Sequence, residues 1–139
     1  MTLTASNLEV GDDHHAVIVD NLTRTQIVQY AGSSGDYNPL HTDEVYATVV
    51  AGYPSVFAHG MLTMGMTGRM LTDYVGDGRL TYFGGRFTSQ VWPGDTLTAT
   101  ATVTAIEVRD GFTIANFDVM TRNQNDVAVF TGTASARLD

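Results

Sequence analysis

The chain has 139 residues, the size of a single domain, and 43% of them are hydrophobic, which is enough for one core. It contains no cysteine, which excludes disulfides and thiolate metal sites, and no lysine, which excludes Schiff-base chemistry. The formal net charge of -8 argues against nucleic acid as a partner, and no apolar run is long enough to cross a membrane. We therefore expect one cytoplasmic domain over residues 1–139.

Helices dominate the first half of the predicted fold. An apolar run within residues 13–21 predicts a first strand. The sequence Thr-Arg-Thr-Gln from Thr23 is a capping box, which predicts a short helix that begins there and ends at Gly32. Residues 33–42 are rich in turn formers and predict a loop, and a second short helix is expected over residues 43–51.

A longer helix is predicted over residues 58–75, with its end at Gly76. Its apolar residues occupy more than one face, as in a helix surrounded by protein. Three internal glycines should each weaken it by about 1 kcal/mol relative to alanine. We expect them to allow the close approach of a sheet, a partner backbone or a ligand. They are Gly60, Gly65 and Gly68.

In the second half, the period of the pattern changes to two, which predicts strands. The first covers residues 79–91 and has a bulge at Gly84-Gly85. Threonine then alternates with apolar residues over residues 96–105, as in a half-buried strand. Alternating apolar residues mark two more strands, around residues 115–119 and 128–138.

Turn signals separate these strands. Pro93-Gly94 fits the centre of a type II turn, Asp110-Gly111 predicts a hairpin, and residues 123–126 predict another turn. Strands joined by hairpins pair antiparallel, and the long helix can cover the apolar face of their sheet. The sequence therefore predicts an α+β fold in which an antiparallel sheet wraps a long helix.

The segment from Gly35 to His41 carries the residues best suited to chemistry. Asp36 and His41 are five positions apart, a spacing that neither a helix nor a strand directs to one point. Asn38-Pro39 interrupts both structures, so a turned loop can aim the carboxylate and the imidazole at one water molecule. Such a pair can move two protons. The structural alternative is that Asp36 closes an Asx turn and His41 caps the next helix.

The longer sequence from Tyr30 to His41, YAGSSGDYNPLH, resembles the signature of the MaoC-like, (R)-specific enoyl-thioester hydratases. Ala58-His-Gly-Met resembles the start of this family's central helix, and residues 82–95 resemble its next strand and turn. Within the family, residues 58–65 and 74–77 most resemble the catalytic B-type subunits of (3R)-hydroxyacyl-ACP dehydratases. The resemblance covers nearly the whole chain and implies a hot-dog fold.

The resemblance also implies a reaction, the reversible hydration of trans-2-enoyl thioesters to (3R)-3-hydroxyacyl thioesters in fatty-acid metabolism, without a metal or other cofactor. His41 would exchange the proton at C2, Asp36 would handle the proton of the water, and the backbone N–H of Gly60 would bind the thioester oxygen. Asn38 would orient the loop or His41, and His59 is expected to cap or pack at the helix start. Further substrate-binding residues are expected to be Met61, Met64, Gly68 and Arg86.

The sequence is compatible with two functions other than the hydratase. Some dehydratases of this kind pair an active with an inactive chain, so the alternative is a non-catalytic subunit that binds acyl thioesters or stabilises a partner. Retention of both Asp36 and His41 favours the active role. A hot-dog thioesterase needs a carboxylate placed for hydrolysis, and the segment from Gly35 to His41 matches hydratases instead.

The substrate and the assembly follow less directly from the sequence. Many hydratases carry a serine at the position of Gly68, so this glycine leaves the acyl-chain preference open. The same chemistry serves thioesters of CoA or of acyl carrier protein (ACP). One hot-dog unit leaves a sheet edge unpaired, so we expect a homodimer or a higher homo-oligomer, with a heterodimer as a further possibility.

Overall fold

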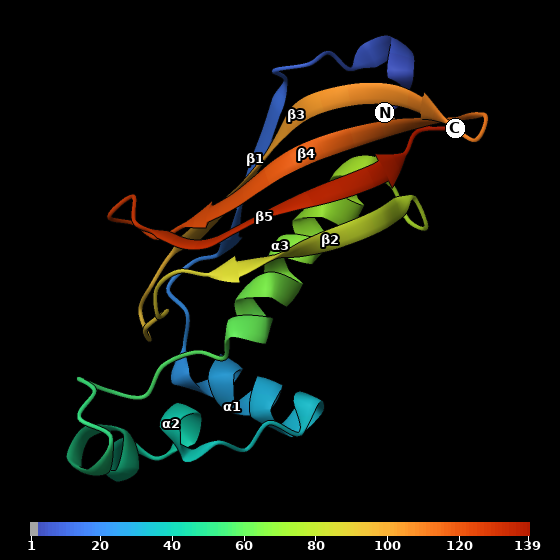
Figure 1. Ribbon diagram of the computed structural model, residues 1–139. Coiled ribbons are helices and arrows are strands. Elements are labelled where there is room, and N and C mark those ends of the chain that lie inside the picture. Colours follow the sequence, from blue (N-terminus) through green and yellow to red (C-terminus); the bar gives the residue numbers. More distant parts are fainter. Residues whose placement is uncertain (1–2) are drawn as a thin grey trace.

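The computed structural model describes residues 3–139 as one antiparallel sheet of five strands that curves around a long helix, α3 (Gly60–Val75) (Figure 1). The strand order is β1-β3-β4-β5-β2. Helix α3 contacts both edge strands, β1 and β2, as well as β3 and β5, so the sheet wraps it and the predicted α+β arrangement is confirmed. The strands are β1 (Asp13–Val19), β2 (Leu80–Phe87), β3 (Leu97–Arg109), β4 (Phe112–Arg122) and β5 (Ala128–Arg137).

The main core lies between the inner face of the sheet and α3. Along β3 every second residue from Leu97 to Val103 is buried, and the threonines between them are more exposed, as the alternation predicts. Full burial of a valine, leucine or phenylalanine side chain stabilises the fold by about 1.5–3 kcal/mol. The largest buried members of this core are Phe117, Phe130, Leu71 and Val75.

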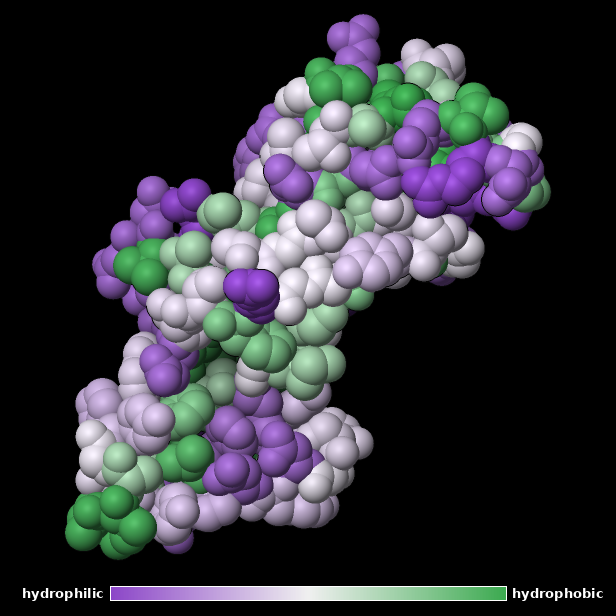
Figure 2. Space-filling view, viewed as in Figure 1, coloured by the Kyte–Doolittle hydropathy of each residue, from purple (hydrophilic) through white to green (hydrophobic). Residues whose placement is uncertain are grey.

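A lobe of short helices extends beyond one end of the sheet (Figure 1). It contains α1 (Arg24–Ser34), the single turn α2 (Pro39–Thr42) and the π-helix η2 (Tyr46–Val50), whereas a 3₁₀ turn, η1 (Ala5–Asn7), precedes β1. The tip of the lobe is apolar (Figure 2), and the valines of its last helical segment are exposed. Within residues 3–139, no helix combines the length and the apolar character that a membrane span requires.

Helix α1 begins as predicted but ends later. The Thr23 hydroxyl accepts from the N–H of Gln26 at 3.1 Å and the Gln26 side chain accepts from the N–H of Thr23 at 2.9 Å, which confirms the capping box. The predicted end at Gly32 is wrong, because Gly32 keeps the helical conformation. The residue that adopts the left-handed conformation is Gly35, with φ of 76°, and its N–H donates to Ala31 at 3.0 Å.

The predicted loop over residues 33–42 is partly wrong, because residues 33–34 still belong to α1 and residues 39–42 form the helical turn α2. Pro39 occupies its first position, where no N–H is needed, and the side chain of Asn38 caps it by accepting from the N–H of Leu40 at 3.0 Å. Helix η2 lies within the second short helix that the sequence predicts. Helix α3 starts two residues later than predicted and ends at Gly76, as predicted.

Strand β2 ends at Phe87 instead of at Val91, and the predicted bulge at Gly84-Gly85 is wrong. Both glycines pair in register with β5. A Cβ atom on Gly85 would lie 2.3 Å from the backbone oxygen of Thr131, and one on Gly132 would lie 2.1 Å from that of Gly84. These glycines therefore permit the close approach of two backbones.

The turns between the strands agree with the sequence. At Gly94, φ is 94° and the N–H of Asp95 donates to Trp92 at 3.0 Å, as in a type II turn. Asp110 and Gly111 have φ of 52° and 80°, and two such residues in succession are what a type I′ hairpin requires.

Candidate active site

His41 is held at one edge by a backbone carbonyl. It lies in the single turn α2, its side chain is only 11% exposed, and its Nδ1 lies 2.6 Å from the carbonyl oxygen of Phe57. A carbonyl oxygen can only accept, so Nδ1 carries the proton and Nε2 is left as a proton acceptor. The ring is therefore oriented as a general base requires.

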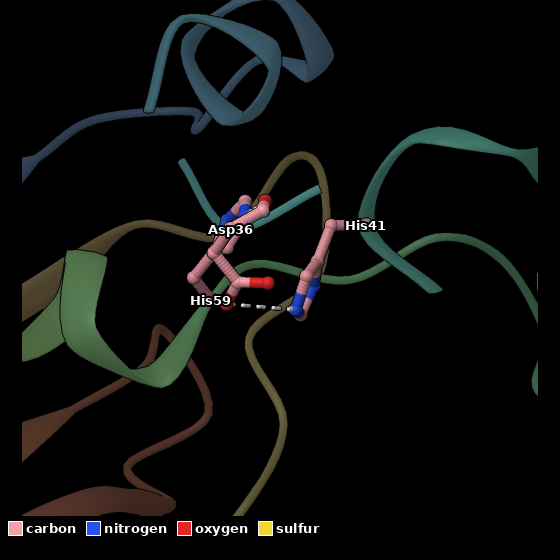
Figure 3. A group of neighbouring side chains, drawn as sticks. All are labelled: Asp36, His41 and His59. Carbon is pink, nitrogen blue, oxygen red and sulfur yellow. Dashed lines mark hydrogen bonds and ion pairs between the residues drawn. The ribbon is translucent and has the colours of Figure 1, made fainter. Parts of the chain in front are cut away.

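Asp36 lies in the short loop between α1 and α2, and its carboxylate faces this free nitrogen (Figure 3). Asp36 Oδ2 is 4.0 Å from His41 Nε2, which is too long for a direct hydrogen bond and suits a bridging water. Asp36 Oδ1 accepts from the N–H of Asn38 at 3.3 Å, so the loop also forms the Asx turn of the structural alternative. The cap of α2, however, is Asn38 rather than His41.

His59 joins these two residues and was not singled out for the site by the sequence. Its Nε2–H donates to the backbone oxygen of Asp36 at 3.0 Å, and its ring stacks on His41 with 3.8 Å between centroids. It occupies the position before α3 but makes no capping bond with its side chain, so it packs there and does not cap. The one feature of the sequence that could have indicated a role for His59 at the site is its position next to Gly60, the predicted oxyanion donor.

The His59 ring is 1% exposed, and burial lowers its pKa. Its Nδ1 is buried without a hydrogen-bond partner among the residues that the structure describes. A proton on that nitrogen would have no acceptor, so His59 is neutral at neutral pH.

Asp36, His41 and His59 each offer one ligand atom, and these atoms lie within 4.8 Å of one another. Two imidazoles that bind one ion direct the lone pairs in their ring planes to a common point. The rings of His41 and His59 are stacked instead, with 27° between their planes, and each has one nitrogen bonded to a backbone carbonyl. The arrangement suits proton transfer better than metal binding.

Gly60 is the first residue of α3, where helical N–H groups have no acceptor within the helix. A cavity of about 300 Å³ lies beside it, between the start of α3 and residues 87–91. A Cβ atom on Gly60 would lie 2.9 Å from the ring of Phe87, so the glycine is needed for this close approach. Asp36 and His41 do not line this cavity, but His59, which touches both, precedes Gly60.

The other residues expected to bind substrate do not meet at the site within one chain. Met61 is 55% exposed on α3, Met64 packs against the main core, and a Cβ atom on Gly68 would lie 3.3 Å from the ring of Phe83. Arg86 lies on the outer face of the sheet, in a cavity of about 730 Å³ that also contains Asp118 and Arg122. The structure does not bring Arg86 together with Asp36 or His41.

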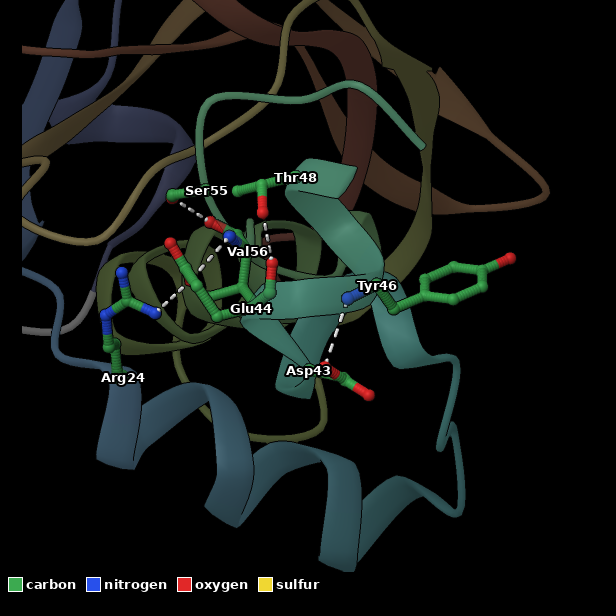
Figure 4. A network of polar contacts seen from close by, with 7 residues as sticks. All are labelled: Arg24, Asp43, Glu44, Tyr46, Thr48, Ser55 and Val56. Carbon is green, nitrogen blue, oxygen red and sulfur yellow. Dashed lines mark hydrogen bonds and ion pairs between the residues drawn. The ribbon is translucent and has the colours of Figure 1, made fainter. Parts of the chain in front are cut away.

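An ion pair braces the lobe that carries the site (Figure 4). Arg24 of α1 lies 2.5 Å from Glu44, and Glu44 accepts from the N–H of Val56 at 3.3 Å. The hydrogen bond from Arg24 lowers the pKa of Glu44. Because Phe57 follows Val56, this network ties α1 to the carbonyl that orients His41.

Comparison with known proteins gives one family. A family model described as "MaoC like domain" matches residues 6–127. The 3-hydroxyacyl-thioester dehydratase Y of Mycobacterium tuberculosis is 40% identical over 92 residues, which cover 64% of this chain and 32% of that protein. The (R)-specific enoyl-CoA hydratase of Rhodospirillum rubrum is 33% identical over 100 residues, which cover 70% of this chain and 69% of that protein. The matched part of this chain thus spans about a third of the length of dehydratase Y.

The solved structures agree with this result. The (R)-hydratase from A. caviae involved in PHA biosynthesis has a TM-score of 0.83 and 28% identity, with 97% of this chain and 100% of that chain covered. The sheet wrapped around α3 is therefore the hot-dog fold that the sequence predicts.

Proposed function

The chain belongs to the family of MaoC-like domains, and on that premise we propose that it catalyses the reversible hydration of trans-2-enoyl thioesters to (3R)-3-hydroxyacyl thioesters. The observation that carries this proposal is the pair formed by the Asp36 carboxylate and His41 Nε2, 4.0 Å apart. The names of the hydratase of R. rubrum and of dehydratase Y support the same reaction.

The pair can perform both proton transfers. In the dehydration direction, neutral His41 Nε2 takes the proton from C2, protonated Asp36 gives its proton to the leaving 3-hydroxyl group, and water departs. The proton on His41 then returns to Asp36 through a bridging water, for which a gap of 4.0 Å leaves room. Hydration is the reverse: Asp36 takes a proton from water as its oxygen adds to C3, and His41 protonates C2.

The thioester oxygen gains negative charge as C2 loses its proton, and this charge needs a donor. We assign the donor to the backbone N–H of Gly60, because the start of α3 presents a free N–H group and the positive end of the helix dipole. The cavity of about 300 Å³ beside Gly60 offers space for the thioester. Asn38, which caps α2, would act indirectly by fixing the turn that holds His41.

Acyl binding and assembly are parts of the same proposal. We propose that residues 1–139 act as one domain and pair with a second copy through β2, which lies at an edge of the sheet. Such pairing would cover the exposed Met61 and Phe87 and bring them, with Met64 and Gly68, close to the acyl chain. CoA and ACP both remain candidate carriers. The role of Arg86 in substrate binding stays a prediction. A cytoplasmic location is also a prediction, which cell fractionation would check.

A direct assay tests the proposed reaction. Purified protein is mixed with crotonyl-CoA and longer enoyl-CoAs, and hydration is followed by the loss of the enoyl-thioester absorbance. Chiral analysis of the product should give the (3R) alcohol, and Asp36→Asn provides the inactive control. Binding of enoyl thioesters without turnover would contradict the proposal and favour the non-catalytic subunit.

A further inference from the structure

We infer that His59 is a positioning residue: it fixes the backbone of Asp36 and the ring of His41 so that their side chains can share one water molecule. This inference rests on the proposed hydratase function. His59 itself does not act on the substrate, because one ring nitrogen is bonded to a backbone oxygen and the other is buried.

The first contact anchors the loop of Asp36 to α3. The Asp36 side chain is 53% exposed, and the other bonds of this residue are local, to the Ser34 hydroxyl and to the N–H of Asn38. The bond from His59 Nε2–H to the Asp36 carbonyl, at 3.0 Å, links residues 23 positions apart in the sequence. It therefore sets the position of the loop relative to the start of α3.

The second contact fixes the plane of the His41 ring. The bond from Nδ1 to Phe57 holds one edge of this ring, but a single hydrogen bond still allows it to tilt. His59 packs against one face, with 3.8 Å between centroids, and the ring of Phe57 meets His41 edge-on at 5.3 Å. Together these contacts keep Nε2 directed toward the Asp36 carboxylate.

The neutral state of His59 is part of this role. The titratable groups that face it are Asp36, His41 and, edge-on at 4.8 Å, Tyr30. A charged His59 would attract the Asp36 carboxylate and repel the proton that His41 carries during the reaction. A buried, neutral ring provides the two contacts without competing for either proton.

Two substitutions separate the two contacts. His59→Phe keeps an aromatic ring against His41 but loses the donor to Asp36, whereas His59→Gln keeps an amide donor at a similar reach but loses the stacked ring. His14→Phe is the matched control, because His14 is also stacked, on Tyr74 at 4.2 Å, but lies on β1.

The expected result is a fall in kcat rather than a rise in KM. Because a displacement of about 1 Å can cost about 100-fold in rate, we expect His59→Phe to lower kcat on crotonyl-CoA by about 10- to 100-fold, with KM changed less than about threefold. His59→Gln should keep more activity than His59→Phe if the loop anchor matters more than the stacking. His14→Phe should match the wild type.

A second readout does not depend on activity. Nitrogen NMR of the imidazoles should show His41 as the Nδ1–H tautomer and His59 as the Nε2–H tautomer in the wild type. In His59→Gln, which loses the stacked ring, the His41 signals should move toward a mixture of tautomers, whereas His59→Phe should keep the wild-type tautomer. The unfolding midpoint confirms that each variant is folded.

The outcomes separate the inference from the proposed function. The inference would be overturned if folded His59→Phe and His59→Gln both kept the wild-type kcat and His59→Gln kept the wild-type His41 tautomer. Activity of the wild type in the same assay would then still support the hydratase function. If the wild type hydrates no enoyl thioester, the proposed function is wrong, and so is a positioning role of His59 in that reaction. A loss of stability without any change in kcat per folded molecule would show that His59 only packs.

Discussion

His41 donates its Nδ1–H to the carbonyl oxygen of Phe57 at 2.6 Å, which leaves Nε2 as a proton acceptor 4.0 Å from the carboxylate of Asp36. The carbonyl that fixes this tautomer follows the segment that Glu44 and Arg24 brace. The orientation of the proposed base thus depends on the packing of the helical lobe as well as on the loop that contains Asp36.

Removal of either member of this pair should abolish most of the activity. We expect Asp36→Asn and His41→Ala each to lower turnover of crotonyl-CoA by at least about 100-fold, because each removes one of the two proton transfers. Asp36 is half exposed, so Asp36→Asn should unfold at the same denaturant concentration as the wild type. Near-normal turnover by either folded variant would contradict the assignment.

Gly60→Ala tests the proposed oxyanion donor. The new Cβ atom would lie 2.9 Å from the ring of Phe87 and would crowd the approach to the backbone N–H. We expect kcat/KM to fall by about 10- to 100-fold. Gly65→Ala is the matched control, because a Cβ atom there meets nothing within 4 Å; it should keep its activity and gain up to about 1 kcal/mol of stability.

The buried His59 should make folding stability depend on pH. Burial lowers its pKa below the ordinary 6.5, so the unfolded chain binds a proton in a pH range where the folded chain does not. The stability is therefore complete above about pH 6.5 and declines as the pH falls through the lowered value. Urea unfolding at about pH 7.5 and about pH 5.5 should show a smaller decline for His59→Phe than for the wild type. Equal declines would refute this contribution.

A buried pair of hydroxyl groups should couple α3 to β4. The Thr67 hydroxyl lies 2.7 Å from that of Thr121 and donates to the backbone oxygen of Thr63 at 2.9 Å. Thr67→Val leaves Thr121 unpaired and should cost about 1–3 kcal/mol, whereas the double variant with Thr121→Val should cost less than the sum. Thr63→Val should be neutral or stabilising, because that hydroxyl is already buried without a partner among the described residues. Denaturant titration of the wild type, Thr67→Val, Thr121→Val and the double variant measures the coupling.

The features that the sequence predicted well depend on neighbouring residues. The capping box at Thr23 and the hairpin at Asp110-Gly111 need only short-range bonds, and the hot-dog resemblance supplied the arrangement of the elements. The prediction that α1 ends at Gly32 is wrong, because any glycine can adopt the left-handed conformation and only the structure shows that Gly35 does so.

The site was predicted in part. The bend at Asn38-Pro39 indicated that Asp36 and His41 would face one point, but the role of His59 depends on contacts between distant segments that no local pattern reveals. Arg86 is a different case. The alternation of β2 directs it away from Phe87, so the sequence already contained the signal that places Arg86 on the outer face.

The packing of β2 against α3 has a consequence for engineering. A Cβ atom on Gly68 would lie 3.3 Å from the ring of Phe83, and one on Gly60 would lie 2.9 Å from the ring of Phe87, so both aromatic rings of β2 pack closely over helical glycines. Four residues of strand span about 13 Å and eight residues of helix about 12 Å, so the two contacts match in spacing. The helix and the strand are therefore held in register at two points, and a shift of one along the other would disrupt both aromatic–glycine contacts. Designs that aim to enlarge the chamber beside the helix start should therefore exchange aromatic and glycine partners together.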